Sequence, residues 1–336
     1  SKTGYFPPKN VSLRITKHKS IMGFFKSLFG GSQTPENKQE KIDRKNFDIL
    51  KYDGIRAMRI GKLTYAIKCF EEATAIQEDI ETMQHQANAY ARVNRLEDAC
   101  KLIQRVTEIV PNDPQNFQLL ANLNYMKEDY INMEKACQKA LELDSENPAN
   151  YFLSAKASIG NKNAIQAIAM LTKAIVLDEN FVEALQTRAE ILWNLQQSKD
   201  ATADVEKLLE INPEDESALL LKAEMLAVGN QEEQALDLTN GVLELNPFNE
   251  KAYILKSNIY LKNKEFDKAI AVFDEAIEIN AQFAKGYHER GRIKLMKGDK
   301  EGSLADMKKA IELAPENGTN ISGEYHNYEQ QRNIPF

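Results

Sequence analysis

Apolar residues recur along this chain at helical spacing, in a phrase that is repeated with few changes. The copies read QKALELDSENP from Gln138, TKAIVLDENF from Thr172, EKLLEINPED from Glu206 and KKAIELAPENG from Lys308. They stand thirty-four residues, or a multiple of thirty-four, apart. Leu, Ile and Ala three and four positions apart mark one face of an α-helix, and the polar residues after them mark a turn. The pattern therefore predicts a repeated helical unit.

The repeat can be followed along most of the 336 residues. Alignment on the central Ala of each phrase predicts eight repeats, with a first spacing of 33 residues and later spacings of 34. They begin near Phe47, Ile80, Pro114, Pro148, Val182, Glu216, Glu250 and Ala284. An array of this kind buries the apolar face of each unit against its neighbours instead of building one central core.

Small residues occupy two fixed positions of the repeat. The eighth position holds Gly54, Ala87, Ala121, Ala155, Ala189, Ala223, Ser257 and Gly291. The twentieth holds Ala66, Ala99, Met133, Ala167, Ala201, Ala235, Ala269 and Ser303. Small side chains here allow a first and a second helix to approach closely. We expect looser pairs in the third repeat, because of Met133, and in the sixth, where Thr239 replaces a bulky apolar residue at position twenty-four.

Turn residues separate the two helices of a repeat. Most repeats have Gly or Asn at position fourteen or fifteen, namely Gly61, Asn94, Asn161, Gly229 with Asn230, Asn263 and Gly298. Gly and Asn accept the left-handed backbone that ends a helix. Position thirty-two is Pro in four repeats, Pro111, Pro213, Pro247 and Pro315, which suits the approach to a following helix. Each repeat is therefore predicted to be helix, tight turn, helix, and no strand pattern competes.

This combination of period, small positions, aromatic or aliphatic position twenty-four (Phe70, Phe273) and Pro at thirty-two resembles the tetratricopeptide repeat. The resemblance covers residues 47–316 and implies an all-α fold, a right-handed α-solenoid of about eight helix-turn-helix repeats. It also implies a concave face, lined mainly by first helices, that binds a peptide segment of another protein. The sequence thus predicts a noncatalytic protein-protein interaction scaffold with a protein or peptide partner.

Positions 2, 5, 9, 12 and 13 of a first helix share one side and would line that face. The candidate groove residues are Gln84, Asn88, Gln118, Asn122, Tyr125, Phe152, Lys156, Gln186, Glu190, Trp193 and Asn258. Their amides can donate to and accept from a peptide backbone whatever its side chains. Tyr125, Phe152 and Trp193 are residues of the type that dominate interface energetics. Two plainer interpretations remain open: solvated amides, and aromatic rings that pack between adjacent first helices.

Charge is distributed unevenly. The formal net charge is -7, yet residues 1 to 45 carry ten Lys or Arg against three Asp or Glu. We assign 1–46 to a basic, disordered arm and 317–336 to a capping segment, with a short helix at 324–331. Ile21, Phe25, Leu28 and Phe29 share one face within the arm. Three interpretations of the arm stay open: plain disorder, docking on the body or a partner, and membrane contact that would make the protein a peripheral membrane adaptor.

Catalytic motifs are not found in the sequence. The four histidines lie far apart, and phosphate-binding loops and nucleophile motifs do not occur. We therefore predict no catalytic residue, no metal site, no cofactor and no enzymatic activity. The acidic body argues against a nucleic-acid surface. Cys69, Cys100 and Cys137 are too scattered for a disulfide framework, which favours a reducing, cytoplasmic location. The oligomeric state is left undetermined.

Overall fold

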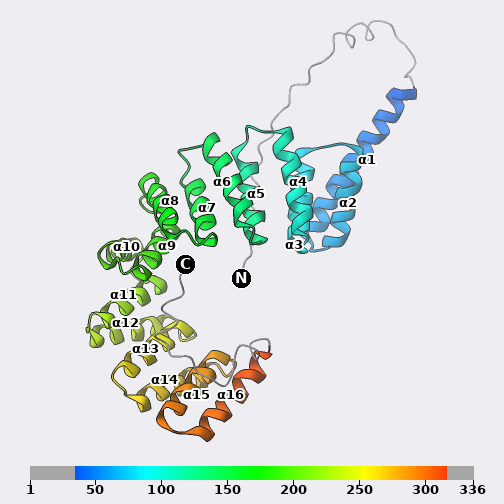
Figure 1. Cartoon of the computed structure of the whole chain (residues 1–336). Helices are drawn as coiled ribbons and strands as arrows, with labels where there is room; N and C mark the ends of the chain where they lie inside the picture. The colour runs from blue at the N-terminus through cyan, green and yellow to red at the C-terminus, as the bar shows by residue number, and fades with distance from the viewer. Residues whose placement is uncertain (1–34, 316–336) are drawn as a thin grey trace. The chain divides into compact units, whose positions relative to one another are not determined.

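The structure is a computed structural model that describes residues 35–315, and within that range the chain forms sixteen α-helices and no strand (Figure 1). The helices divide into two compact halves, which we call the N-terminal half, up to Asn161, and the C-terminal half, from Lys162. The N-terminal half contains α1 (Pro35–Arg59), α2 (Leu63–Ile76), α3 (Ile80–Arg92), α4 (Leu96–Ile109), α5 (Pro114–Met126), α6 (Tyr130–Leu143) and α7 (Pro148–Gly160).

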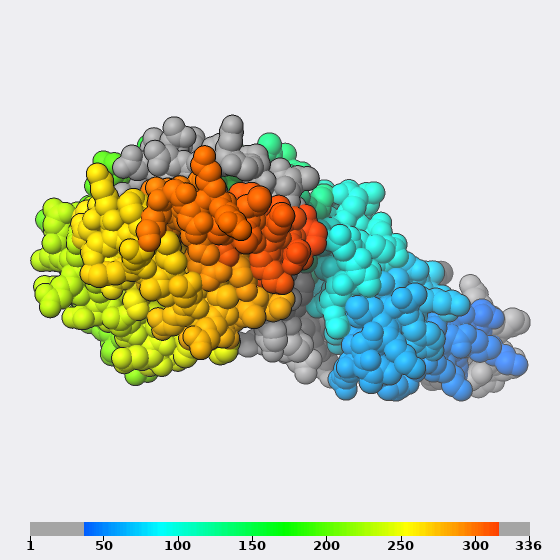
Figure 2. Space-filling model, turned by 90° about the horizontal axis from the view of Figure 1, so that it is seen from below, coloured from blue at the N-terminus to red at the C-terminus, as the bar shows by residue number. Residues whose placement is uncertain are grey.

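The C-terminal half contains α8 (Ala164–Leu177), α9 (Val182–Asn194), α10 (Ser198–Ile211), α11 (Glu216–Val228), α12 (Glu232–Leu245), α13 (Glu250–Lys262), α14 (Phe266–Ile279), α15 (Ala284–Lys297) and α16 (Lys300–Leu313). Odd-numbered helices are the first helices of the repeats and even-numbered helices are the second. In Figure 2 the side chains of this half, from yellow-green to orange, pack into a continuous surface. The predicted all-α solenoid is confirmed.

The first helix differs from the sequence-based expectation in its length. It begins at Pro35, whereas the first repeat is registered at Phe47 and the residues before it were assigned to the arm. Residues 35–46 are rich in Glu, Lys, Gln and Arg, which are good helix formers, and Pro is well tolerated in a first helical turn. The apolar segment around Phe25 and the capping helix expected at 324–331 lie outside the described residues.

The small positions are the places where paired helices pack. At position twenty, the side chains with no exposed surface are Ala66, Ala99, Met133, Ala167, Ala201, Ala235 and Ala269. At position eight of the first repeat, a Cβ added to Gly54 would lie 2.5 Å from Cε1 of Phe70, which is itself fully buried. A side chain at Gly54 would displace that ring, so the close approach requires glycine.

The two departures from the repeat pattern are accommodated within the core. Met133 and Thr239 both have no exposed surface. The Thr239 hydroxyl donates to the carbonyl oxygens of Ala235 and Leu236, at 3.1 and 2.9 Å, so its polar group is satisfied inside its own helix. At the level of burial, neither residue loosens its helix pair as we expected.

All eight turns between paired helices place one residue in the left-handed region, always at position fifteen. These residues are Gly61, Asn94, Glu128, Lys162, Gln196, Asn230, Lys264 and Gly298. Half of them are neither Gly nor Asn, although a Cβ in this conformation costs about 1 to 2 kcal/mol. Packing of the paired helices therefore fixes the turn length and overrides local preference.

Polar residues before the first helices act as N-caps. The Asp79 carboxylate accepts from the backbone N–H of Thr82 at 3.0 Å. The same role belongs to Asp113, Asn147, Asp215 and Asn249. Each cap satisfies a backbone donor that the helix itself leaves unpaired. The polar end of the repeated phrase is thus a helix start signal.

Two repeats of the C-terminal half share an arginine-aspartate pair. Arg188 donates to both carboxylate oxygens of Asp204 at 2.8 and 2.6 Å, and to the Thr172 hydroxyl at 3.0 Å. At the same positions, Arg290 donates to Asp306 at 2.9 and 2.6 Å. Both aspartates are 4% exposed. These bidentate bonds connect the first and second helix of a repeat.

We predict that Ala201→Leu lowers the free energy of unfolding by about 1 to 3 kcal/mol, because the extra atoms overpack the contact between α9 and α10. Ala203→Leu on the exposed side of α10 is the matched control and should leave stability nearly unchanged. Urea denaturation of both variants measures the difference. Equal stability of the two would contradict the repeat register.

The stability of the C-terminal half should fall in acid through Asp306. Burial alone raises the pKa of Asp306, but hydrogen bonds from Arg290 and Lys294 outweigh it and hold the pKa below its usual value. A carboxylate with a depressed folded pKa stabilises the fold above its unfolded pKa of about 3.9 and loses that contribution as pH falls through the folded value.

Asp306→Asn should therefore cost about 2 kcal/mol at pH 7, and the difference from wild type should shrink as pH falls below the unfolded pKa of about 3.9. Urea denaturation across this pH range measures it, with the exposed Glu301→Gln as control. A difference that does not change with pH would show that the ion pair contributes nothing.

Candidate functional site

Seven of the predicted groove residues lie on the first helices of the N-terminal half. We call them the amide face: Gln84 and Asn88 on α3, Gln118, Asn122 and Tyr125 on α5, Phe152 and Lys156 on α7. All seven are half-buried. The repeat places each at position five, nine or twelve, so successive helices present equivalent side chains.

The two glutamines of the amide face hold neighbouring repeats together. Gln84 donates its side-chain amide to the Asn116 side-chain oxygen at 2.8 Å, and Gln118 donates to Asn150 at 2.6 Å. Asn116 and Asn150 are 1% and 0% exposed. Asn150 also donates to the backbone oxygens of Ala140 and Asp144, at 3.2 and 2.8 Å. The position-five amides are therefore committed to structure.

The two asparagines at position nine differ from these glutamines. Asn88 and Asn122 are half-buried, and neither side-chain amide bonds to another side chain or backbone group of residues 35–315. Each amide keeps two donors and an acceptor available. Together they form a short row of polar groups on adjacent repeats.

Tyr125 on α5 and Lys156 on α7 also belong to the amide face, and they contact each other. The Lys156 ammonium lies 3.8 Å from the centroid of the Tyr125 ring, a cation–π contact, and the Tyr125 and Tyr130 rings meet edge to face at 6.3 Å. Burial lowers the pKa of Lys156, because a desolvated ammonium is less stable in its charged form. A carboxylate placed beside this ammonium would offset that penalty.

The remaining predicted residues lie on first helices of the C-terminal half. Gln186 donates to Glu190 at 2.6 Å on α9. Trp193 packs beside Val205 and Leu221, and its indole N–H donates to Glu224 at 3.2 Å. Asn258 on α13 is half-buried. Much of the Trp193 ring is therefore used in packing, and a role of these four residues in binding stays a prediction.

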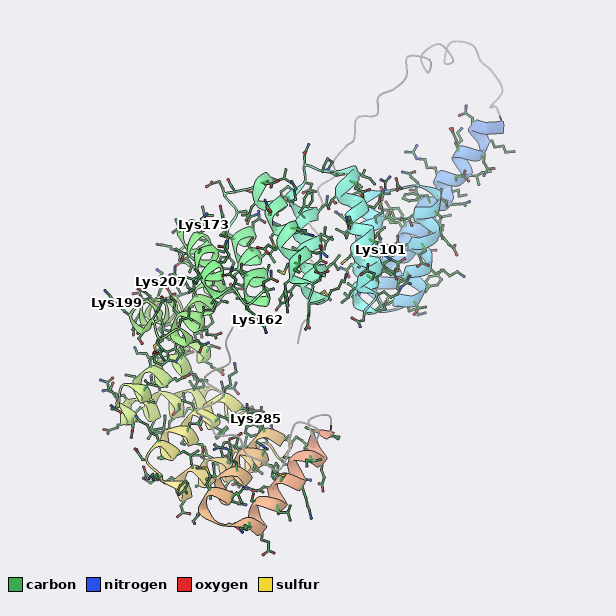
Figure 3. All side chains as sticks on the ribbon, in the orientation of Figure 1. Lys101, Lys162, Lys173, Lys199, Lys207 and Lys285 are labelled. Atoms are coloured by element: carbon green, nitrogen blue, oxygen red, sulfur yellow. The ribbon has the colours of Figure 1, made fainter. Side chains whose placement is uncertain are left out.

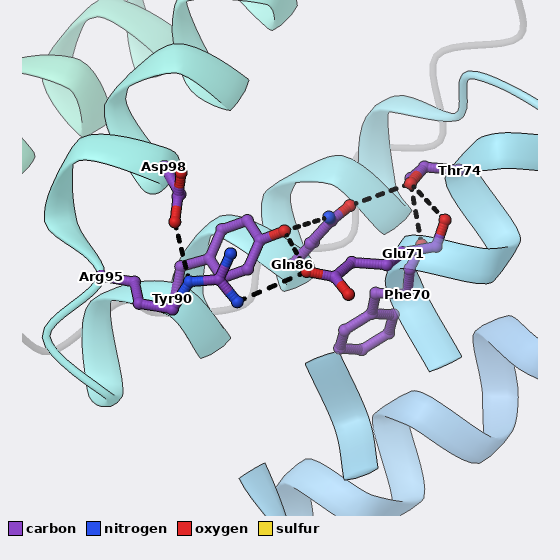
Figure 4. A network of polar contacts seen from close by, with 7 residues as sticks. All are labelled: Phe70, Glu71, Thr74, Gln86, Tyr90, Arg95 and Asp98. Atoms are coloured by element: carbon purple, nitrogen blue, oxygen red, sulfur yellow. Dashed lines mark hydrogen bonds and ion pairs between the residues drawn. The ribbon is translucent and has the colours of Figure 1, made fainter. Parts of the chain in front are cut away.

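One polar network was not anticipated from the sequence. Tyr90 donates its hydroxyl to Glu71 at 2.7 Å and accepts from Gln86 at 2.9 Å, while the Arg95 guanidinium lies 4.2 Å from its ring centroid (Figure 4). Arg95 in turn bonds Asp98 at 2.7 Å. The network joins α2, α3 and α4 beside a shallow depression of about 260 Å³. The separated positions of these residues gave no signal in the sequence.

The three cysteines and His85 occupy structural surroundings. Cys69, Cys100 and Cys137 are buried free thiols. Burial raises the pKa of Cys100 to about 11 and that of Cys137 to about 12, so both stay protonated near neutral pH. The His85 ring stacks on Phe70 at 6.0 Å, and burial lowers the pKa of His85. Residues 35–315 contain no cluster of His, Cys, Asp and Glu that could hold a metal ion.

The helices of the described range also carry no candidate membrane span. Among residues 35–315, no helix has both the length and the apolar composition that crossing a bilayer requires.

Two family models match parts of the sequence. One, described as a tetratricopeptide repeat, matches residues 284–317, which coincide with the eighth repeat as registered from the periodicity. The other, described as subunit 3 of the anaphase-promoting complex, or cyclosome, matches residues 194–276. A search of the curated proteins found no match to the sequence.

Solved structures share the fold. A tetratricopeptide repeat protein from Parabacteroides merdae aligns with a TM-score of 0.60 at 20% identity, over 70% of this chain and 93% of that chain. Yeast Tom70 aligns with a TM-score of 0.55 at 19% identity, over 77% of this chain and 57% of that chain. The Cut9–Hcn1 hetero-tetramer of the APC/C gives 0.50 at 12% identity, over 87% and 56%.

At these identities the likeness concerns the fold alone. The helix pairs, the period of 34 residues and the match over the eighth repeat all agree with it. Residues 284–317 therefore match a tetratricopeptide repeat in sequence, and the described helices share the fold of tetratricopeptide-repeat proteins.

Proposed function

We propose that this protein is a noncatalytic interaction scaffold and that the amide face of the N-terminal half holds an extended peptide segment of a partner protein. The observation that carries the proposal is the pair Asn88 and Asn122, whose half-buried side-chain amides have no partner among residues 35–315. An amide can bond to the backbone of any peptide, so the partner would be recognised by its extended conformation more than by its sequence.

The spacing of the repeats supports an extended ligand. Helices packed side by side lie about 8 to 10 Å apart. Three residues of an extended chain span about 10 Å. Asn88 and Asn122 are at the same position of adjacent repeats, and the bond from Gln84 to Asn116 shows that α3 and α5 are neighbours. A row of such amides can therefore meet every third peptide unit of the ligand.

The chemical character of the amide face supports binding instead of catalysis. Its side chains are amides, aromatic rings and one partly buried ammonium, Lys156. None of these types forms the pair of nucleophile and adjacent base that covalent catalysis uses. Tyr125 and Phe152 offer apolar surface to the ligand, and Lys156 favours an acidic residue in it. The buried free thiols agree with the proposed cytoplasmic location.

Stability measurements separate the two kinds of amide. Asn116→Ala removes the buried partner of Gln84 and should cost about 1 to 3 kcal/mol of unfolding free energy. Asn88→Ala removes no bond within the described protein, so its effect should stay within about 0.5 kcal/mol. Chemical denaturation of the two variants gives the values. Similar losses in both would mean that Asn88 is also structural.

Binding is tested by affinity purification from native lysate with the intact chain, with Asn88→Ala/Asn122→Ala, and with the exposed Asn240→Ala as matched control. We expect proteins that the intact chain and the control retain and the double variant loses. The bound segment, synthesised as a peptide, should bind the double variant roughly 30-fold more weakly, since each lost hydrogen bond contributes about 1 kcal/mol. Identical recovery by all three proteins would refute the amide face as the binding site.

A further inference from the structure

The first helix, α1, leaves three large apolar side chains exposed on one side. Ile42 is 44% exposed, Ile49 is 49% exposed and Tyr52 is 54% exposed. They follow each other at intervals of seven and three residues, which places them along one side of the helix over about 15 Å. We call these three residues the α1 face. The first turns of α1, at the blue end of the ribbon, project beyond the other helices that the structure describes (Figure 3).

The contact between α1 and α2 is made by a different side of α1. Gly54 lies against the Phe70 ring of α2, and Ala57 belongs to the same hydrophobic core as Phe70. Both Gly54 and Ala57 are buried. Packing of the first repeat therefore does not require the α1 face to be apolar.

Later repeats show what covers this side of a first helix. At position three of the fourth repeat, Asn150 donates to the Ala140 carbonyl of α6, the second helix of the preceding repeat, at 3.2 Å. At position six of the second repeat, the His85 ring stacks on the Phe70 ring of α2 at 6.0 Å. Positions three and six of a first helix therefore contact the second helix that precedes it.

In the first repeat these two positions are Ile49 and Tyr52. Among the described residues α1 comes first, so no second helix precedes it. Position three is buried in all seven later repeats, where it holds Thr82, Asn116, Asn150, Ala184, Ala218, Ala252 and Gly286. A repeat that ends an array in water needs a polar outer side. A large apolar residue at this position instead indicates that another segment covers it.

The sequence before α1 contains a segment that can reach the α1 face. Residues 21–29 read IMGFFKSLF, with six large apolar residues and one charged residue, Lys26. Five residues, 30–34, separate this segment from Pro35, and a chain of five residues spans at most about 18 Å. Ile42 lies about 10 Å along the helix from Pro35, and nine residues in a helix extend about 13 Å. The segment thus matches the α1 face in both reach and length.

We propose that residues 21–29 dock on the α1 face as a helix and cover it as a preceding second helix would. Ile21, Phe25, Leu28 and Phe29, which share one face at helical spacing, would supply the apolar contact. The covalent connection selects this occupant, because a segment joined by a short link is present at an effective concentration in the millimolar range. The docking lies apart from the amide face and does not depend on it.

A second copy of this chain fits the α1 face less well. Lys38 and Lys45 alternate with Ile42 and Ile49 at intervals of four, three and four residues, so all four share one side of α1. Two copies paired through this side would bring their lysines together, a repulsive arrangement. Residues 21–29 carry a single lysine and meet less repulsion there.

The test is hydrogen exchange of the full chain, followed by mass spectrometry. Ile42→Gln/Ile49→Gln makes the α1 face polar, and Phe25→Gln/Leu28→Gln makes the docking segment polar. The second variant changes no residue of the described helices, so its repeats should fold normally. Ile131→Gln, which removes a side chain that is 65% exposed on α6, is the matched control.

We expect the backbone amides of residues 21–29 to exchange roughly tenfold more slowly in the full chain than in a free peptide of the same sequence. Both double variants should restore rapid exchange, whereas Ile131→Gln should leave it slow. The slow exchange should not change when the protein is diluted, because the contact is intramolecular. Asn88→Ala/Asn122→Ala should also leave it unchanged, so this proposal and the amide face can fail separately.

Four results would overturn the proposal. Rapid exchange of residues 21–29 in the wild-type chain would show that they do not dock. Slow exchange that persists in Ile42→Gln/Ile49→Gln would place the docking site elsewhere. Slow exchange that is lost on dilution would make the occupant a second copy of the chain. Slow exchange that requires phosphatidylserine vesicles would make the occupant of the α1 face, or of the segment, a membrane.

Discussion

Close packing of the two helices within each repeat is the constraint on which the rest of the structure depends. It requires a small residue at position twenty, as with Ala66 and Ala201, and in the first repeat it requires Gly54 to admit the Phe70 ring. It also fixes the turn length, so that Glu, Lys and Gln residues adopt the left-handed backbone that Gly and Asn prefer. Because every repeat must pack its two helices closely, equivalent positions recur along each half. Side chains that lie outside the contact between these two helices are available for other roles.

The periodic features could be predicted from the sequence because packing imposes them on every repeat. Helix pairs, small positions and polar caps such as Asp79 each follow from the period and from residue type. The start of α1 at Pro35 was not predicted, because the residues before Phe47 have helical propensity without the apolar pattern of the repeat. The network around Tyr90 and the glutamine bonds between repeats were also missed. They join residues distant in the chain whose side-chain directions a sequence does not specify.

Comparing the sequence-based prediction with the structure also changes the interpretation of the candidate site. Five amides looked equivalent in the sequence, yet Gln84 and Gln118 bond buried asparagines of the next repeat and Gln186 bonds Glu190. Asn88 and Asn122 remain, because neither side-chain amide bonds to another group of residues 35–315. The proposed amide face thus depends on side-chain amides that make no bond within the described protein.

Hydrogen exchange of side-chain amides, measured by NMR on the full chain, tests this central distinction most directly. The account predicts slow exchange of the amide protons of Gln84 and Gln118, since their bonds to Asn116 and Asn150 must open first, and rapid exchange of those of Asn88 and Asn122. Equal exchange rates for all four side chains would contradict the division between structural and available amides, and with it the proposed amide face.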